Sequence, residues 1–268
     1  MNHLLRELAP IGDTAWALIE HEAKTRLVTY LAARKLVDFT GPLGWEHSAT
    51  DLGRVESIGT PFDAVVARRR RVLPLVELRA PFTVARAELD DAARGATNLE
   101  LGELEEAAEH IALAENRSVF HGFPEGGIDG ITAAASSPPI ELPDDLEQYP
   151  TTVARAVNGL RMGGIQGPFG LAVGPVGWTR IIETTERGGY LLLEHLGHIL
   201  GGPVVWAPGV SGAVVLSLRG GDFALECGQD LSIGYRAHDA DTVSLYLEES
   251  VSFRVLEPDA AVHLVLPS

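Results

Sequence analysis

The sequence predicts an α+β fold, on two observations. Segments with helical apolar spacing and segments with strand-like alternation are mixed along the chain without a regular βαβαβ order. The composition, with 46% hydrophobic and 22% charged residues among 268, is that of a globular protein with a substantial core. The length allows one large domain or two modest ones.

The first predicted element is a helix that begins at Asp13 or Thr14 and runs to about Lys35, because its apolar residues recur on one face. Residues 50–84 then show a strand pattern on both sides of a Gly-Thr-Pro break, which predicts a long two-stranded excursion carrying Arg68–Arg71. Its tip is too polar to bury itself, so we expect this arm to pack on a neighbouring subunit.

A short helix is predicted over 86–94, and the strongest helix of the chain over 99–123, with glutamates on its outer side. Further helices are expected at 151–162, 177–185 and 191–200. The predicted strands are 169–173, 204–207, 213–218, 223–227, 231–235, 242–248, 250–256 and 261–266. We expect 204–207 and 213–218 to form a hairpin around Gly209–Gly212.

Charge and cysteine content exclude several classes of protein. The formal net charge of −16 disfavours binding to nucleic acid or to an anionic membrane. The single cysteine, Cys227, excludes a disulfide framework and indicates a reducing, cytoplasmic location. The N-terminal stretch contains Glu7 and Asp13 and lacks a signal-peptide core, and no apolar run is long enough to span a membrane.

Two segments resemble the nucleophile sites of hydrolases, but a structural role explains each of them better. The string GVSGA at 209–213 approaches the Gly-x-Ser-x-Gly nucleophile elbow, but Ala213 replaces the last glycine and a strand follows instead of a helix. Cys227 alternates with Phe223 and Leu225 on one strand face, which predicts a buried core thiol, not a nucleophile. No catalytic constellation is expected.

Metal, phosphate and RNA sites are likewise not expected. His195 and His198 share a predicted helix face, but no third ligand stands at a diagnostic spacing. His110 lacks the glutamate three residues earlier that a ferritin-like site requires. Neither phosphate-binding glycine motif occurs. In RGGDFALECGQDLSIGY (219–235), Gly220–Gly221 predicts a turn, with Asp222 bonding its own turn backbone.

Six strings occur in the chain in a fixed order: LAPIGDTAW, RKLVDFTGPLGWEHSATDLG at 34–53, LRAPFTVARAELDDAARG at 78–95, GGIDGI at 126–131, RGGDFALECGQDLSIGY at 219–235 and VSLYLEESVSF at 243–253. Together they resemble the encapsulin shell proteins, the linocin-like family of bacterial nanocompartments. The resemblance spans nearly the whole chain.

The resemblance implies the fold of the major capsid protein of tailed bacteriophages. The parts of that fold correspond to five ranges of this sequence. These are an N-terminal helix with the start of a peripheral domain (1–49), an extended loop (50–84), a peripheral domain with a spine helix (85–126), an axial domain (127–220) and a last segment that returns to the peripheral domain (221–268). It implies a non-enzymatic protomer of an icosahedral, cytoplasmic nanocompartment, in the smallest form of about sixty copies.

The resemblance also implies a cargo enzyme, such as a dye-decolorizing peroxidase or a ferritin-like protein, that docks on the inner wall through a C-terminal peptide. A groove with an apolar floor and a few charges suits such docking. The matching positions are Leu27, Tyr30, Leu31, Arg34, Asp38, Leu231 and Ile233. The alternative is that these residues only pack the N-terminal helix against the sheet.

A further resemblance concerns the loop at 184–198, which borders the five-fold pore in the family. The matching residues here are Thr184, Glu186, Arg187, Gly188, Gly189, Tyr190 and His195. Some relatives bind flavin through an aromatic residue where this chain has Ala87, so we assign no cofactor. A viral or prophage capsid protein remains an alternative, and so does an enzyme of the protease or bacteriocin kind.

Overall fold

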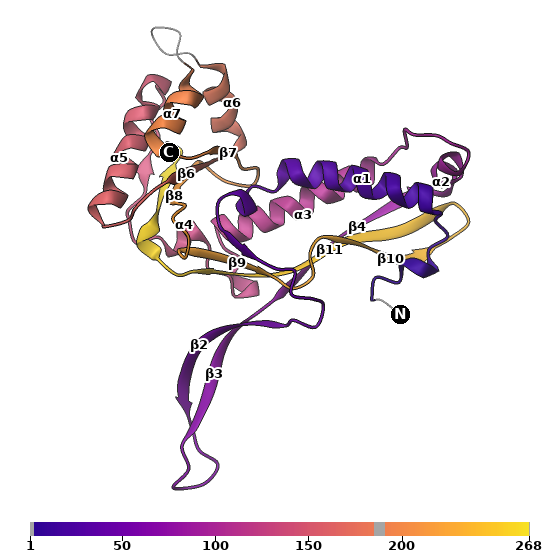
Figure 1. Cartoon of the computed structure of the whole chain (residues 1–268), viewed down its shortest axis with the longest axis horizontal. Helices are drawn as coiled ribbons and strands as arrows, with labels where there is room; N and C mark the ends of the chain where they lie inside the picture. The colour runs from indigo at the N-terminus through magenta and orange to yellow at the C-terminus, as the bar shows by residue number, and fades with distance from the viewer. Residues whose placement is uncertain (1–2, 185–190, 268) are drawn as a thin grey trace.

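The computed structural model describes residues 3–184 and 191–267. They form an elongated unit of one sheet and two long helices, a compact unit of sheet and helices at one end, and an arm that projects from their junction (Figure 1). The two sheets of five strands each, with the arm as a separate two-stranded ribbon, confirm the α+β prediction.

The long strand β11 (Thr242–Val255) organises the elongated unit. It pairs antiparallel with β4 (Val76–Ala85) along one side, and on the other side with β10 (Ser232–His238) and then β9 (Phe223–Cys227). The short β1 (Asp38–Thr40) adds to β9 in parallel. The predicted break near residue 249 is wrong, because Glu248 and Glu249 are both buried and ion-paired and the strand continues through them.

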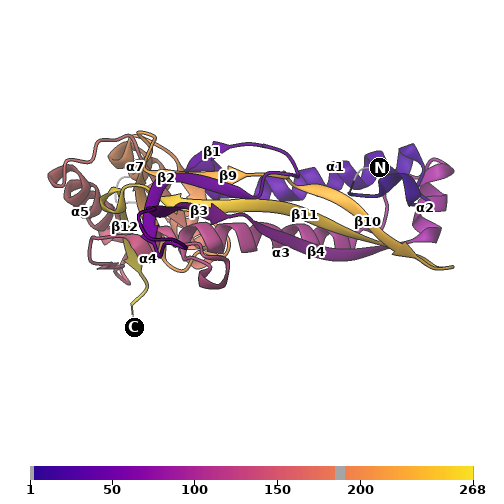
Figure 2. The ribbon, with the colours of Figure 1, turned by 90° about the horizontal axis from the view of Figure 1, so that it is seen from below.

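Helices α1 (Asp13–Tyr30) and α3 (Gly102–Phe120) lie along one face of this sheet, and α2 (Arg86–Ala93) closes its far end (Figure 2). Their buried apolar residues form one core with the inward side chains of β4, β10 and β11. Burial of this stripe drives the packing of the two helices. Helix α1 ends at Tyr30 instead of about Lys35, and a 3₁₀ turn over Ala33–Lys35 follows it.

The compact unit is built on a second sheet in the order β5-β12-β8-β6-β7. Its strands are β5 (Ile140–Glu141), β6 (Phe169–Val173), β7 (Val204–Trp206), β8 (Ala213–Ser217) and β12 (Ala261–Val265). Its helices are α4 (Ile131–Ala134), α5 (Tyr149–Met162), α6 (Pro175–Glu183) and α7 (Leu192–Leu200). Short 3₁₀ helices span Arg6–Leu8, Pro124–Gly126, Leu146–Gln148 and Pro258–Ala260.

Two predictions fail in this second sheet. The hairpin between 204–207 and 213–218 is wrong, because β7 pairs with β6 in parallel and β8 pairs with the other side of β6 antiparallel. Strand β6 lies inside the sheet, with a paired strand on each edge, and all five of its residues are buried. Segment 221–268 does not stay with the first sheet, since β12 lies between β5 and β8 in the second.

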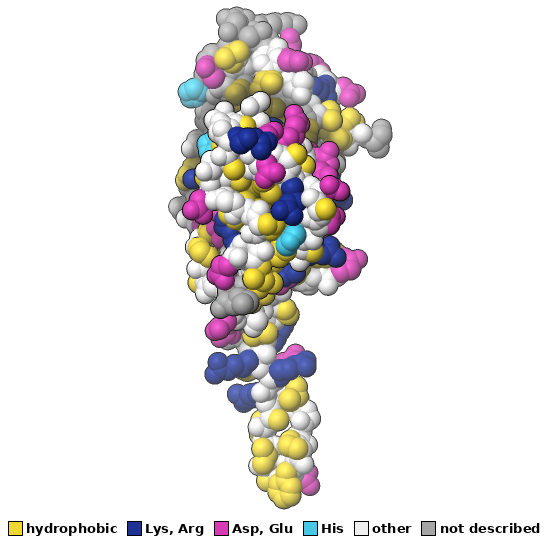
Figure 3. Space-filling model, turned by 90° about the vertical axis from the view of Figure 1, so that its right-hand side faces the viewer, with side chains coloured by type: hydrophobic (Ala, Val, Ile, Leu, Met, Phe, Trp, Pro, Cys, Tyr) yellow, Lys and Arg dark blue, Asp and Glu magenta, His cyan; other side chains and the backbone are white. Residues whose placement is uncertain are grey.

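The arm consists of β2 (Ala49–Ile58) and β3 (Ala67–Pro74), paired antiparallel. It is shorter than the predicted excursion over 50–84, because β4 belongs to the main sheet. Its tip is not polar as predicted: Phe62 and Val66 are 74% and 77% exposed there. Figure 3 shows apolar side chains toward the tip and a band of cationic side chains nearer the base.

The base of the arm is fixed to the main sheet. The carboxylate of Glu226 on β9 accepts a hydrogen bond from Thr50 Oγ1 at 2.7 Å and lies 2.7 Å from His47 Nε2. Burial alone would raise the pKa of Glu226, but these hydrogen bonds outweigh it and lower that pKa. The arm is thus held at its root and has few contacts beyond it.

Asn116 on α3 joins the two units. Its side-chain oxygen accepts hydrogen bonds from the N–H groups of Ala32 and Ala33, each at 3.0 Å, and its amide nitrogen donates to the carbonyls of Tyr30 and Pro208, each at 2.9 Å. One fully buried side chain therefore satisfies main-chain groups at the end of α1 and in the loop before β8.

We predict that Asn116→Ala lowers the free energy of unfolding by about 3 kcal/mol, because four buried main-chain groups lose their partner. Thermal or denaturant unfolding of the purified protein measures this loss. The exposed Asn158→Ala on α5 is the matched control, with a change within about 0.5 kcal/mol. Equal stability of the two variants would contradict the role given to Asn116.

Candidate functional site

A groove of about 440 Å³ lies between α1 and the start of β10. Helix α1 forms one wall with positions one helical turn apart, including Glu20, Lys24, Leu27 and Val28. The opposite wall is the segment Leu231–Ile233, where the chain enters β10. An apolar floor bordered by charged side chains is suited to an extended peptide or an apolar side chain.

The N-terminal segment closes one end of the groove. The carbonyl of Leu4 accepts a hydrogen bond from the N–H of Tyr235 at 2.8 Å, so the segment lies against the edge of β10. Arg6 beside it pairs with Glu20 at 2.5 Å and has its guanidinium carbon 4.1 Å from the centre of the Trp16 ring. These contacts hold Leu4 and Arg6 at the groove wall.

Arg34 stands at the other end and is almost fully engaged with acidic groups. Its Nε donates to Glu115 at 2.7 Å, Nη1 to Asp230 at 2.7 Å and Nη2 to Glu249 at 2.8 Å. Burial alone would lower the pKa of Arg34, but the attraction of Glu115 and Glu249 outweighs burial and raises that pKa. The side chain of Arg34 is therefore fixed at this end of the groove, where acidic side chains balance its charge.

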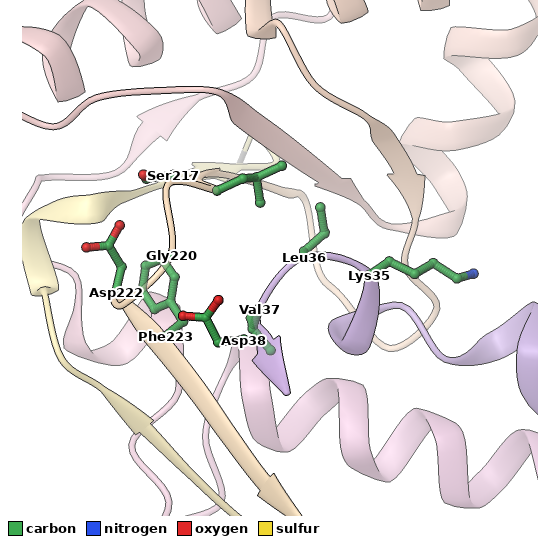
Figure 4. Close-up of a pocket in the computed structure, with 9 residues that line it drawn as sticks. Lys35, Leu36, Val37, Asp38, Ser217, Gly220, Asp222 and Phe223 are labelled. Carbon is green, nitrogen blue, oxygen red and sulfur yellow. The ribbon is translucent and has the colours of Figure 1, made fainter. Parts of the chain in front are cut away.

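Four of the seven predicted docking residues line this groove, namely Leu27, Arg34, Leu231 and Ile233. Tyr30 instead faces Trp206, with ring centroids 5.4 Å apart, and Leu31 packs at the edge of the helix–sheet core. Asp38 lies elsewhere: its carboxylate accepts the N–H of Gly221 at 2.5 Å and borders a separate cavity of about 170 Å³ (Figure 4).

Sequence reasoning missed other residues that line the groove, including Leu4, Arg6, Glu20, Lys24 and Val28. The residues of α1 were detectable, since Glu20, Lys24, Leu27 and Val28 continue one helix face at spacings of three and four. No local pattern indicates Leu4 or Arg6, because their place depends on a contact with β10, more than 200 residues later in the chain.

The predicted pore loop is only partly described. Thr184 follows the end of α6 and His195 lies within α7. Glu186, Arg187, Gly188, Gly189 and Tyr190 lie outside the described residues.

The residues considered as catalytic or metal-binding candidates lie in surroundings that suit a structural role. Cys227 is buried, and burial raises the pKa of its thiol to about 12. Ser211 lies two residues before β8, so a strand and not a helix follows it. No cluster of three or more metal-binding side chains occurs within residues 3–184 and 191–267, and none of their helices is long and apolar enough to cross a membrane.

The glycine pair in RGGDFALECGQDLSIGY is a turn. Gly220 and Gly221 have φ angles of 85° and 82°, which favour glycine, so the predicted turn is confirmed. The predicted role of Asp222 is wrong, since its carboxylate accepts hydrogen bonds from Arg219 Nε and Nη2 instead of from its own turn. Asp222 and Arg219 therefore form a structural ion pair.

The fold is that of a capsid protein. A virus-like particle from Pyrococcus furiosus matches with a TM-score of 0.65 and 17% identity, over 92% of this chain and 98% of that one. The capsid of an empty GTA particle matches with a TM-score of 0.54 and 15% identity, over 89% and 90%. These likenesses define the class as proteins with the capsid fold of tailed phages.

The chain belongs to the encapsulin shell-protein family. The family model described as "Encapsulating protein for peroxidase" matches residues 1–252. A type 1 encapsulin shell protein of Rhodospirillum rubrum is 50% identical over 98% of this chain and 96% of its own length. One of Rhodococcus erythropolis is 43% identical over 98% and 100%. As these names state, the family is one of shell proteins and not of enzymes.

A more distant relative joins a shell protein to a redox protein in one chain. The diheme-cytochrome–encapsulin shell fusion protein of Kuenenia stuttgartiensis is 23% identical over 84% of this chain and 63% of its own length.

We predict that Cys227 in the native protein does not react with iodoacetamide at pH 8, because a buried thiol with a pKa near 12 is almost entirely protonated. Mass spectrometry of intact protein should show no adduct until denaturant is added, and one adduct afterwards. Rapid labelling of the native protein would contradict this assignment.

Proposed function

We propose that this chain is the protomer of a closed icosahedral shell of about sixty identical subunits, located in the cytoplasm, which encloses a cargo enzyme. The observation that supports shell formation most directly is the arm. It extends away from both units, and its exposed tip residues Phe62, Val65 and Val66 find no cover within their own subunit.

The arm has little stability on its own and would gain stability when packed between subunits. A two-stranded ribbon without a packed face is at best marginally stable in water. Burial of its apolar tip against a second copy would remove that exposed surface from water and stabilise both partners. Repetition of this contact by symmetry closes a shell from identical chains, which supports the proposal.

We predict that Phe62→Asp with Val66→Asp prevents shell formation, because buried unpaired charges at a contact are strongly unfavourable. Size-exclusion chromatography and negative-stain microscopy should show small species instead of spheres. The control variant, Phe62→Leu with Val66→Leu, keeps the tip apolar and should form spheres. Normal spheres from the aspartate variant would sink the proposed role of the arm.

The second part of the proposal concerns cargo. We infer that the groove between α1 and β10 binds a short peptide at the C-terminus of the cargo enzyme, with Leu27, Leu231 and Ile233 as the apolar floor. Each subunit presents the same groove, so weak single contacts sum by avidity. The fusion relative from Kuenenia stuttgartiensis, which carries a redox protein in the same chain, is consistent with a redox enzyme as cargo.

We predict that Val28→Asp or Leu231→Asp abolishes cargo loading and leaves the shells intact. Val28 is 60% exposed at the groove, so its change puts a charge into the peptide site without disturbing the core. The test is co-expression with a reporter that carries the C-terminal tail encoded by the neighbouring gene, followed by gel analysis of purified shells.

The matched control is Thr29→Asp, which adds the same charge to an exposed neighbouring position of α1 that does not line the groove. It should load cargo normally. Loading by all three variants would mean that the peptide binds elsewhere.

The proposal also includes the remaining docking residues and the pore segment. Tyr30, Leu31 and Asp38 lie outside the groove lining, so any contact of theirs with cargo would extend beyond it. We propose that the segment between Thr184 and His195 borders an opening for small molecules. A capsid protein that packages DNA would share the fold, but a net charge of −16 disfavours nucleic acid as the cargo.

A further inference from the structure

Two carboxylic acids lie side by side beneath Arg34. Glu115 comes from α3 and Glu249 from β11, and both side chains are completely buried. Each gives one oxygen, Oε2, to the guanidinium of Arg34. The proposed docking of cargo does not by itself require either residue.

The second oxygen of each acid has no hydrogen-bond partner among the residues that the structure describes. Glu115 Oε1 and Glu249 Oε1 are both buried. The two carboxylates are neighbours, because their Oε2 atoms bind Nε and Nη2 of one guanidinium at 2.7 Å and 2.8 Å. Glu248, the preceding residue, is equally buried but contacts His3 with one oxygen and Arg79 with the other. The pair is therefore unlike an ordinary buried ion pair.

The ionisable groups that face the pair come from every neighbouring element. The turn after α1 supplies Arg34, the loop before β10 supplies Asp230, and β9 supplies the thiol of Cys227. Cys227 is neutral because burial raises its pKa to about 12. Arg34 is the cation that contacts both acids, and it also pairs with the carboxylate of Asp230.

Two ionised carboxylates cannot satisfy one another, since an ionised carboxylate only accepts hydrogen bonds. One proton resolves this conflict: a protonated carboxyl group can donate to the neighbouring carboxylate, while each acid still accepts from Arg34. Burial followed by repulsion from Glu115 raises the pKa of Glu249 well above its usual range, and burial also raises that of Glu115. The two acids titrate as a unit.

We propose that Glu115 and Glu249 share one proton, and that this protonated pair is the positioning element that holds Arg34 at the end of the groove. With the proton in place, Arg34 faces two negative charges, one on the pair and one on Asp230. Without it, Arg34 faces three, and the two buried carboxylates repel each other directly below it.

The proposal predicts the direction in which the stability of the folded state changes with pH. The folded state binds the shared proton more tightly than the unfolded chain, so stability falls as pH rises from the ordinary carboxyl range through the raised pKa of the pair. At alkaline pH the two acids separate, and the segment that carries Arg34 loosens. That segment forms one end of the groove through Arg34, so the role of the pair in docking rests on the proposed function, whereas the shared proton does not.

The first experiment is infrared spectroscopy of the purified protein at pH 8, where ordinary carboxyl groups are ionised. The wild type should retain the carbonyl band of a protonated carboxylic acid. Glu249→Gln and Glu115→Gln should each lose that band, because an amide replaces the protonated acid and can donate in its place. Glu248→Gln, on the opposite face of the same strand, is the matched control and should keep it.

The second experiment follows hydrogen exchange of residues 31–36 between pH 7 and 10, corrected for the intrinsic base-catalysed rate. As pH rises toward the apparent pKa of the pair, protection in the wild type and in Glu248→Gln should fall by about tenfold per pH unit, and above that pKa it should level off. In Glu249→Gln and Glu115→Gln it should stay nearly constant, which a purely structural role for these residues would not produce.

Absence of the carboxylic-acid band from wild-type protein at pH 8 would overturn the proposal, and that measurement needs no variant to fold. Equal pH dependence in Glu249→Gln and the wild type would overturn it as well. Neither measurement involves cargo, so failure of the groove to bind a peptide would leave both results interpretable and would count only against the proposed docking.

Discussion

The buried polar junction between α1, α3 and β11 is the constraint on which the other features depend. Asn116 holds four main-chain groups at the end of α1 and near Pro208, and the neighbouring Glu115 holds Arg34. Buried polar groups of this kind tolerate little displacement, because any unpaired group is costly. The junction thereby sets where α1 ends, how the two units meet, and where the groove lies.

Strand β11 extends this polar system to both faces of its sheet. Glu248 and Glu249 follow each other and so point to opposite faces. Glu248 engages His3 and Arg79 on one face, and Glu249 engages Arg34 on the other. His3 also stacks on Trp45, with ring centroids 3.8 Å apart, so the N-terminal segment is fixed next to the chain that leads into the arm. The groove end at Arg34 and the N-terminal segment are thus both held by ion pairs to β11.

The two proposed functions of the molecule have different physical requirements. Assembly uses an arm that is anchored only at its root, through His47, Thr50 and Glu226, and is free to meet a neighbouring copy. Docking uses a groove whose end at Arg34 is held by buried ion pairs and cannot shift without cost. A flexible contact suits a surface that adapts to a partner, and a rigid one suits recognition of a short peptide.

Local patterns along the chain predict one group of features correctly. The helices over 86–94 and 99–123, the buried strand 169–173 and the buried Cys227 follow from periodicity and alternation. Strand pairing, in contrast, follows from contacts between distant segments: β12 joins the second sheet, and β7 and β8 flank β6, since pairing depends on burial between those segments. The tertiary structure also brought Leu4 to the groove and Glu115 to Glu249, because contacts across more than one hundred residues leave no local pattern.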